Sequence, residues 1–156
     1  MEINKKRGFT LVEMLVAMAI FSGLAIAVTT VALSVIKSQR RAFAIQNVQE
    51  TGRFILESVS KEIRTSSVES GAGVLSSLDI INDKNVPVRY EFDGIKIKRN
   101  SQDLNPDKVD VRGAFIVNER LAPEGWLVTL VMRLSSAGDR VEEQVTIDLQ
   151  SSVAPR

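Results

Sequence analysis

One stretch near the N-terminus decides the fold: Gly8-Phe9-Thr10-Leu11-Val12-Glu13-Met14-Leu15-Val16. It opens an apolar run from Phe9 to Ile36, 28 residues long, in which Glu13 is the single charged residue. A helix rises ~1.5 Å per residue, so this run would extend roughly 42 Å, more than the ~30 Å hydrocarbon core of a bilayer. The run therefore predicts a membrane-spanning helix over residues 9–36.

A short polar leader, residues 1–8, precedes this run and ends in the basic cluster Lys5-Lys6-Arg7. Such a cluster is typical of the charged region of a secretory signal or a signal anchor. A second basic group follows the run within residues 37–41, so the positive-inside rule is nearly balanced. We expect a cytoplasmic N-terminus.

A rival cleavage site lies inside the apolar run. Ala25-Ile26-Ala27 fits the small-x-small pattern of ordinary signal peptidase. A cut there would leave Val28–Ile36 as an apolar N-terminus and would place Glu13 inside the hydrophobic region of the signal. Both consequences count against this site.

The carboxylate of Glu13 is the most informative side chain of the run. A carboxylate inside a spanning helix costs ~2.5–3.5 kcal/mol on insertion scales, so such a residue suggests a function and a partner. Its position allows a second interpretation, because Glu13 is close enough to the membrane surface to reach headgroups. A cut after Gly8 would create an α-amine on Phe9, and that amine could pair with the Glu13 carboxylate of another copy.

The helical pattern continues beyond the apolar run, through residues 37–66. Polar and charged residues there flank one apolar stripe, which predicts an amphipathic helix continuing the anchor. The stripe comprises Val48, Gly52, Ile55, Val59 and Ile63. We expect one nearly continuous helix of about 55 residues that ends at Thr65-Ser66-Ser67.

Residues 67–156 change to a period of two and predict an antiparallel β domain. Val88–Phe92 and Ile95–Lys98 alternate around Asp93-Gly94, which is a strong hairpin signal. Further strands are expected over residues 109–117 and 126–134, and a half-exposed closing strand over Val141–Leu149. The fold class is α+β: a long N-terminal α-helix packed on an antiparallel β-sheet.

Composition excludes several classes of site. The chain contains no cysteine and no histidine, so disulfides, the usual zinc sites and a histidine-based triad are excluded. No phosphate loop, nucleophile elbow or paired-acid motif is present, and we expect no enzyme activity and no cofactor. The 20 basic and 19 acidic residues create no field for nucleic acid, and we expect no nucleic-acid partner.

The quoted stretch, with Lys5-Lys6-Arg7 before it, resembles the N-terminal signal of type IV prepilins and type II secretion pseudopilins at every position of that motif. The resemblance implies a pilin-like fold. It also implies that prepilin peptidase cuts after Gly8 and N-methylates Phe9. In that family, the glutamate matching Glu13 helps recruit subunits and set their register by pairing with the N-terminal amine of a neighbour. The pairing is favourable because a buried carboxylate and a buried amine are each costly when they have no partner.

The rest of the chain is similar only in layout to PilW-like minor pilins and J-type minor pseudopilins. Major pilins often carry a proline in the spanning helix and a C-terminal disulfide, and this chain has neither, which favours a minor subunit. The resemblance implies as partners other pilin or pseudopilin subunits, an inner-membrane assembly platform and the lipid bilayer. It implies a single pass through the bacterial inner membrane, with assembly into a periplasmic or cell-surface filament. The alternative is an anchored extracytoplasmic binding module that does not polymerise.

Three weaker candidates have simpler explanations. Loop carboxylates could bind calcium, although solvated side chains explain them better and we expect no metal site. These carboxylates are Asp79, Asp83, Asp103, Asp107 and Asp110. The basic residues Lys96, Lys98 and Arg99 could touch DNA, although a solvated hairpin face is the simpler explanation. Tyr90 and Trp126 could act as stacking platforms, although we expect them to be core residues of strands.

Overall fold

The structure is a computed structural model that describes residues 8–121, 124–138 and 140–155. The chain forms two units, residues 1–39 and residues 40–156, and each is described by itself. Helix α1 (Leu11–Arg64) supplies the helical part of the first unit and continues into the second. The 54-residue helix confirms the predicted length and contains no proline.

The second part of α1 carries the predicted apolar stripe to the domain core. Its buried residues are Ala44, Val48, Thr51, Gly52, Ile55, Val59 and Ile63. Their spacing of three and four places them on one helix face, as amphipathic periodicity requires. The helix ends as predicted, where the backbone N–H groups of Thr65 and Ser66 turn back to the carbonyls of Glu62 and Ile63.

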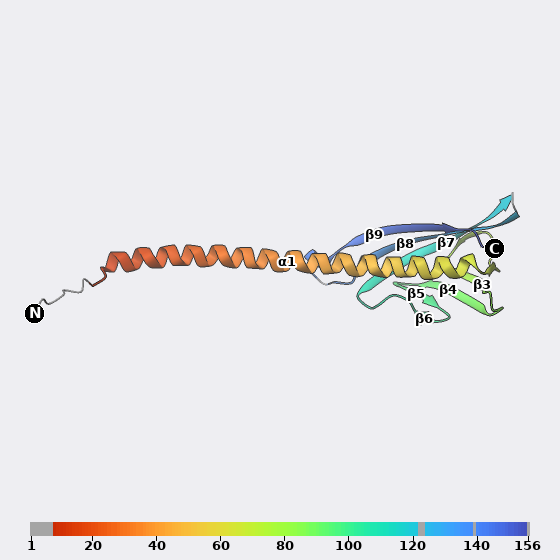
Figure 1. Ribbon diagram of the computed structural model, residues 1–156, viewed down its shortest axis with the longest axis horizontal. Helices are drawn as coiled ribbons and strands as arrows, with labels where there is room; N and C mark the ends of the chain where they lie inside the picture. Colours follow the sequence, from red (N-terminus) through yellow and green to blue (C-terminus); the bar gives the residue numbers. More distant parts are fainter. Residues whose placement is uncertain (1–7, 122–123, 139, 156) are drawn as a thin grey trace, which may run out of the picture. The chain divides into compact units, whose positions relative to one another are not determined.

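The β domain contains two antiparallel sheets where the sequence predicted one. The five-stranded sheet has the order β1-β3-β4-β5-β6 and the four-stranded sheet the order β2-β7-β8-β9. Figure 1 draws the two sets of strands on either side of the C-terminal part of α1. The strands are β1 (Ser67–Val68), β2 (Gly73–Leu75), β3 (Ser77–Ile81), β4 (Pro87–Asp93), β5 (Lys96–Arg99), β6 (Gln102–Asp103), β7 (Val109–Leu121), β8 (Glu124–Ser136) and β9 (Thr146–Val153).

The predicted hairpin forms between β4 and β5, with its turn shifted by one residue. Asp93 pairs with Lys96, so the two central residues of the turn are Gly94 and Ile95, not Asp93 and Gly94. Gly94 has a φ of 62°, and a positive φ at the first central position is what type II′ turns require of glycine. The shift leaves Ile95 exposed at the turn and buries Ile97 in the core.

The closing strand begins later than predicted. Residues Val141–Glu143 form a short 3₁₀ helix, and β9 begins at Thr146. The reason lies in its pairing partner, because β8 ends at Ser136, which bonds to Val145. Residues before 145 therefore have no strand beside them, and Glu143 interrupts the alternation that begins at Val145.

One hydrophobic core joins the helix stripe to both sheets. Its largest fully buried side chains include Tyr90 and Phe115, and Phe115 meets Phe92 with ring centroids 5.1 Å apart. Trp126 is partly buried against the same core. The structure therefore confirms that Tyr90 is a core residue and places Trp126 at the margin of the core.

Gly113 lies where β7 passes closest to its neighbours. A Cβ added there would collide with the carbonyl oxygen of Val131 and lie 2.8 Å from the ring of Phe92. We expect Gly113→Ala to lower the free energy of unfolding by about 1–3 kcal/mol, because overpacking forces backbone and ring apart. Urea denaturation of the full chain in detergent micelles measures this. Gly71→Ala, where no atom lies within 4 Å of the new carbon, is the matched control and should change little.

Candidate functional site

The start of α1 is organised around Thr10 and Glu13. The backbone N–H and the hydroxyl of Thr10 both donate to Oε2 of Glu13, each over 3.0 Å. The backbone N–H of Glu13 donates in return to Oγ1 of Thr10 over 3.2 Å. This reciprocal arrangement is a capping box, which satisfies backbone donors that the first helical turn leaves free. Glu13 therefore already has a local partner in the uncut chain.

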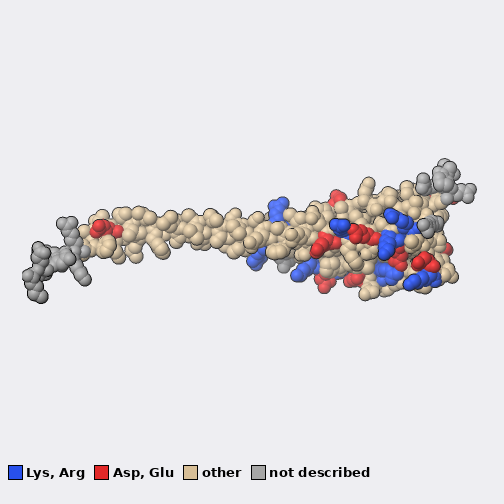
Figure 2. Space-filling view, in the orientation of Figure 1, with Lys and Arg blue, Asp and Glu red and all other residues tan. Residues whose placement is uncertain are grey.

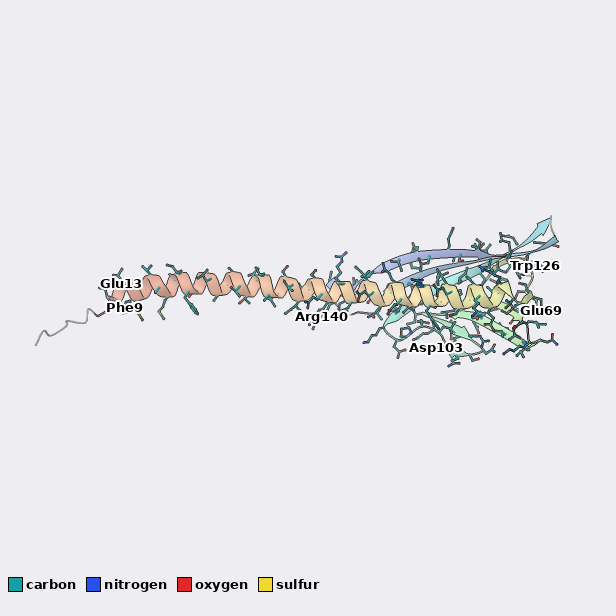
Figure 3. All side chains as sticks on the ribbon, in the orientation of Figure 1. Phe9, Glu13, Glu69, Asp103, Trp126 and Arg140 are labelled. Atoms are coloured by element: carbon teal, nitrogen blue, oxygen red, sulfur yellow. The ribbon has the colours of Figure 1, made fainter. Side chains whose placement is uncertain are left out.

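The peptide bond between Gly8 and Phe9 lies just before the capped helix and is open to solvent. The Phe9 side chain is 83% exposed, and Figure 3 shows it beside the first turn, close to Glu13. No described atom lies within 4 Å of the position that a Cβ on Gly8 would take, and its backbone is not in the left-handed region. Within the described residues, packing and backbone geometry therefore give no reason for a glycine at position 8.

Within the first unit, α1 presents an uncharged surface over residues 14–36. No charged residue occurs from Met14 to Ile36, and Figure 2 shows this stretch free of Lys, Arg, Asp and Glu. Helix α1 is long and apolar enough to cross a membrane, and none of the spanning segment is buried within the chain. A surface of this kind needs lipid or other helices around it. The leader cluster Lys5-Lys6-Arg7 lies outside the described residues.

The second unit contains a polar network that ties α1 to the five-stranded sheet. Arg99 donates to both carboxylate oxygens of Glu62, over 2.9 and 2.6 Å, and the Tyr90 hydroxyl donates to the same carboxylate. The bonds from Arg99 lower the pKa of Glu62 despite partial burial. Burial, followed by the Glu62 carboxylate, raises the pKa of Tyr90. The three side chains are hydrogen-bonded to one another, so we interpret the network as a structural link between α1 and the five-stranded sheet.

We expect Glu62→Ala to lower the free energy of unfolding by about 2 kcal/mol at neutral pH, because it leaves Arg99 without its partner. A carboxyl with a lowered pKa contributes stability above its unfolded value of about 4.3 and loses it as the pH falls through the folded pKa. The difference in the free energy of unfolding between the Glu62→Ala variant and the unchanged chain should therefore become smaller as the pH falls. Urea denaturation at several pH values measures it.

Glu57→Ala is the matched control on the same helix. Glu57 forms an ion pair with Arg53 over 2.7 Å, with both side chains more than 60% exposed. Exposed pairs of this kind are worth less than about 1 kcal/mol. An equal loss for Glu57→Ala and Glu62→Ala would contradict the role given to the network.

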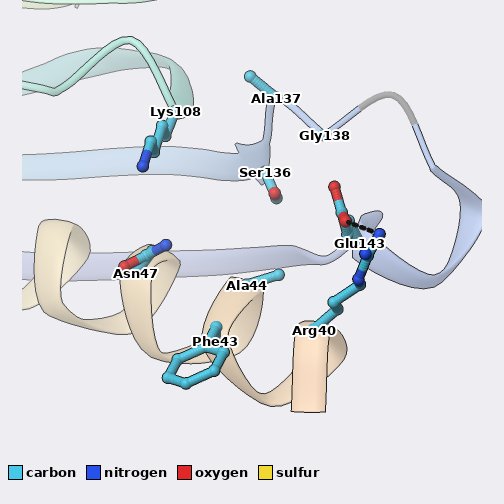
Figure 4. Close-up of a pocket in the computed structure, with 9 residues that line it drawn as sticks. All are labelled: Arg40, Phe43, Ala44, Asn47, Lys108, Ser136, Ala137, Gly138 and Glu143. Atoms are coloured by element: carbon cyan, nitrogen blue, oxygen red, sulfur yellow. Dashed lines mark ion pairs between the residues drawn. The ribbon is translucent and has the colours of Figure 1, made fainter. Parts of the chain in front are cut away.

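A hollow of about 310 Å³ opens beside the first turns of α1 in the second unit. Figure 4 shows its lining, which includes Arg40, Phe43, Lys108 and Glu143. Arg40 and Glu143 form an ion pair across 3.7 Å. Ser136 also lines the hollow, and among the described residues its hydroxyl forms no hydrogen bond with Lys108 or Glu143.

Three of the five calcium candidates, Asp79, Asp103 and Asp107, form ion pairs with basic side chains. Lys96 lies 3.8 Å from Asp103 and 2.7 Å from Asp107, so a side-chain cation already sits between these carboxylates. Asp79 faces Arg89 over 3.6 Å. In the part of the chain that the structure describes, no three acidic residues are placed to hold a metal ion.

The basic residues of β5 are engaged in the same way. Lys98 pairs with Asp93, and Arg99 pairs with Glu62. With Lys96 on Asp107, these charges are not left free as a basic face for DNA.

Sequence reasoning missed two features of these sites. The Thr10-x-x-Glu13 spacing just before an apolar run is a recognisable capping-box signal, and it identifies Thr10. The pairing of Glu62 with Arg99 has no such signal, because the two residues are 37 positions apart and meet only through the tertiary fold.

Comparison with protein families gives one match. Residues 3–36 match a family model described as the prokaryotic N-terminal methylation motif. The match supports the type IV pilin and pseudopilin class, whose members are structural subunits processed by prepilin peptidase and assembled with other subunits. Together with the apolar helix, it supports anchoring in the inner membrane. Searches of curated proteins and of solved structures found no match.

Proposed function

We propose that the chain is a minor subunit of a type IV pilus or a type II secretion pseudopilus. Prepilin peptidase would cut after Gly8 and N-methylate Phe9, and the basic cluster Lys5-Lys6-Arg7 would hold the leader in the cytoplasm. The observation that carries the proposal is the methylation motif at the start of a helix whose residues 14–36 are exposed and uncharged. The open geometry at Gly8 supports it, because a requirement for glycine there would come from a protease and not from the fold.

Glu13 would change partners during assembly. In the uncut chain the capping box satisfies its carboxylate locally. Cleavage adds a positive amine to Phe9, and an amine and a carboxylate left apart in an apolar filament core are both costly. Pairing between the Glu13 carboxylate and the Phe9 amine of a neighbouring subunit would relieve both costs and set the helix register.

The remaining parts of the chain follow from this arrangement. Residues 9–36 would span the membrane and later form the filament core, and residues 37–66 would continue the anchor as an amphipathic helix. Residues 67–156 would be the extracytoplasmic domain, which contacts other minor subunits after extraction by the assembly platform. The absence of proline from α1 and of cysteine from the chain supports a minor subunit over a major one.

Photo-crosslinking from the apolar helix tests assembly against the anchored-module alternative. Phe21 is 72% exposed in the spanning segment, so a photoreactive phenylalanine analogue there would face neighbouring helices in a filament. We expect adducts, identified by mass spectrometry, with proteins that carry the same methylation motif. A host strain without prepilin peptidase is the control and should give none. Adducts with lipid alone in the normal host would contradict the proposal.

A further inference from the structure

Strand β9 leaves one whole edge of the four-stranded sheet unpaired. The N–H of Ser136 donates to the carbonyl of Val145, which makes 136 and 145 a hydrogen-bonded pair and sets the phase of the β8–β9 ladder. Antiparallel ladders alternate, so the odd-numbered residues of β9 bond to β8 and the even-numbered residues point their N–H and C=O groups outward. These residues are Thr146, Asp148, Gln150 and Ser152, and no backbone partner is found for them among the described residues.

Apart from the charge of Asp148, which Arg133 pairs, this edge lacks the usual protection against pairing. The outer strands β1, β2 and β6 are only two or three residues long, whereas β9 has eight residues. Strand β9 contains no proline and no lysine, and its register with β8 runs without a bulge. Natural sheets blunt free edges with these devices, so a long regular edge without them indicates a place where another strand can add.

A groove runs alongside this edge, between β9 and α1. It consists of two adjoining hollows of about 280 and 410 Å³ that share Leu56 and Glu57. The partly buried side chains of Ile147 and Leu149 line the first hollow, and Ser151 lines the second. An edge strand beside a helix, with an apolar groove between them, is the arrangement into which extended peptides add as a strand.

The helix side of the groove is positively charged. Arg53, Lys61 and Arg64 line it, and its one acidic residue, Glu57, is already paired with Arg53. The acidic residue of β9, Asp148, lies outside this lining, and Arg133 holds its carboxylate over 2.7 and 2.9 Å. The surplus positive charge favours an acidic occupant. It disfavours a second copy of this chain, which would bring Lys61 and Arg64 of its own groove to the same interface.

We propose that the groove between α1 and β9 binds an extended, acidic segment of another protein as an added strand. Its backbone would bond to the outward groups of β9, its apolar side chains would cover Leu56, and its carboxylates would face Lys61 and Arg64. The inference goes beyond the proposed function, because the groove lies wholly within residues 40–156 and does not depend on cleavage after Gly8.

The test uses the full chain in detergent micelles and a synthetic eight-residue peptide in which Thr alternates with Val, Leu and Glu. Fluorescence anisotropy measures binding, and NMR hydrogen exchange reports on β9. We expect binding that slows exchange of the outward amides at 146, 148, 150 and 152 at least about tenfold. Peptides with Lys in place of Glu, or with N-methylated alternate amides, should bind at least about tenfold more weakly.

Two variants locate the binding surface. Gln150→Pro removes an outward donor and leaves the bonds to β8 intact, and the double variant Lys61→Glu with Arg64→Glu reverses the charge of the groove. Both should weaken binding of the acidic peptide at least about tenfold, whereas Lys84→Glu, at an exposed turn, should not. Absence of binding, equal binding of the Lys peptide, or protection of β9 by self-association without peptide would each overturn the proposal.

Discussion

A Gly8→Val chain is expected to accumulate at full length in the membrane. The Cβ added at position 8 meets no described atom within 4 Å, so the helix and the domain should form as before. A protease that requires the smallest side chain before the cut would no longer accept the bond between Gly8 and Phe9. We expect the mature product to fall at least about a hundredfold, because a blocked reacting geometry costs several kcal/mol. Immunoblotting of membranes, with mass spectrometry of the product, measures this ratio.

Gly23→Val is the matched control within the same unit. No atom lies within 4 Å of the position of its new carbon either, and valine is tolerated in an apolar spanning helix. This variant should be trimmed normally. Trimming of the Gly8→Val chain at the unchanged bond would contradict the role given to the leader. A cut after Ala27 in both variants would instead identify the rival signal-peptidase site.

Glu13→Gln is expected to be trimmed and methylated and yet to be almost absent from filaments. Glutamine at this position can still accept the bonds from Thr10, so the capping box and the start of the helix survive. The variant removes only the negative charge, and the amine of a neighbouring Phe9 would then be buried without a partner. An unpaired buried charge costs about 3–5 kcal/mol, which corresponds to a loss of incorporation of at least about a hundredfold.

Thr10→Val separates helix capping from charge pairing. It removes the hydroxyl of the capping box, at a cost of about 1 kcal/mol to the helix start, and keeps the carboxylate of Glu13. Quantitative immunoblotting of sheared filaments should show it near the normal level. If Thr10→Val fails as badly as Glu13→Gln, or if Glu13→Gln assembles normally, the pairing account is wrong and Glu13 acts mainly as part of the cap.

The local features of the fold were predictable because each has a short-range cause. The apolar run and the stripe at Val48, Ile55 and Val59 indicated one helix, and α1 spans 54 residues as expected. The hairpin was found from alternation around Asp93-Gly94, but its register follows from the turn type that Gly94 adopts. From the alternation alone, the two central residues of the turn could be placed one position earlier or later along the chain. The burial of Ile97 in the core is consistent with only one of these registers.

The features that sequence reasoning missed depend on partners far away in the chain. Two sheets form because β7 pairs with β2 and β8, whereas β3 and β4 pair within the other sheet, and no local pattern reports such a choice. Val141 was predicted to begin the closing strand, yet β8 ends before residues 141–143 and leaves them without a partner strand. At the candidate site, the motif predicted Gly8, Phe9 and Glu13, and the structure adds Thr10 as the local partner of Glu13. The roles of Gly8, Phe9 and Glu13 in processing and assembly stay predictions.

The central claim is that the mature chain begins at Phe9 with a positive amine available to the Glu13 carboxylate of a neighbouring subunit. Mass spectrometry of the N-terminal peptide from the mature protein, purified from membranes or filaments, tests it most directly. The account predicts a peptide that begins with monomethylated Phe9. A peptide that begins with Met1, with Val28 or with any other residue would contradict it.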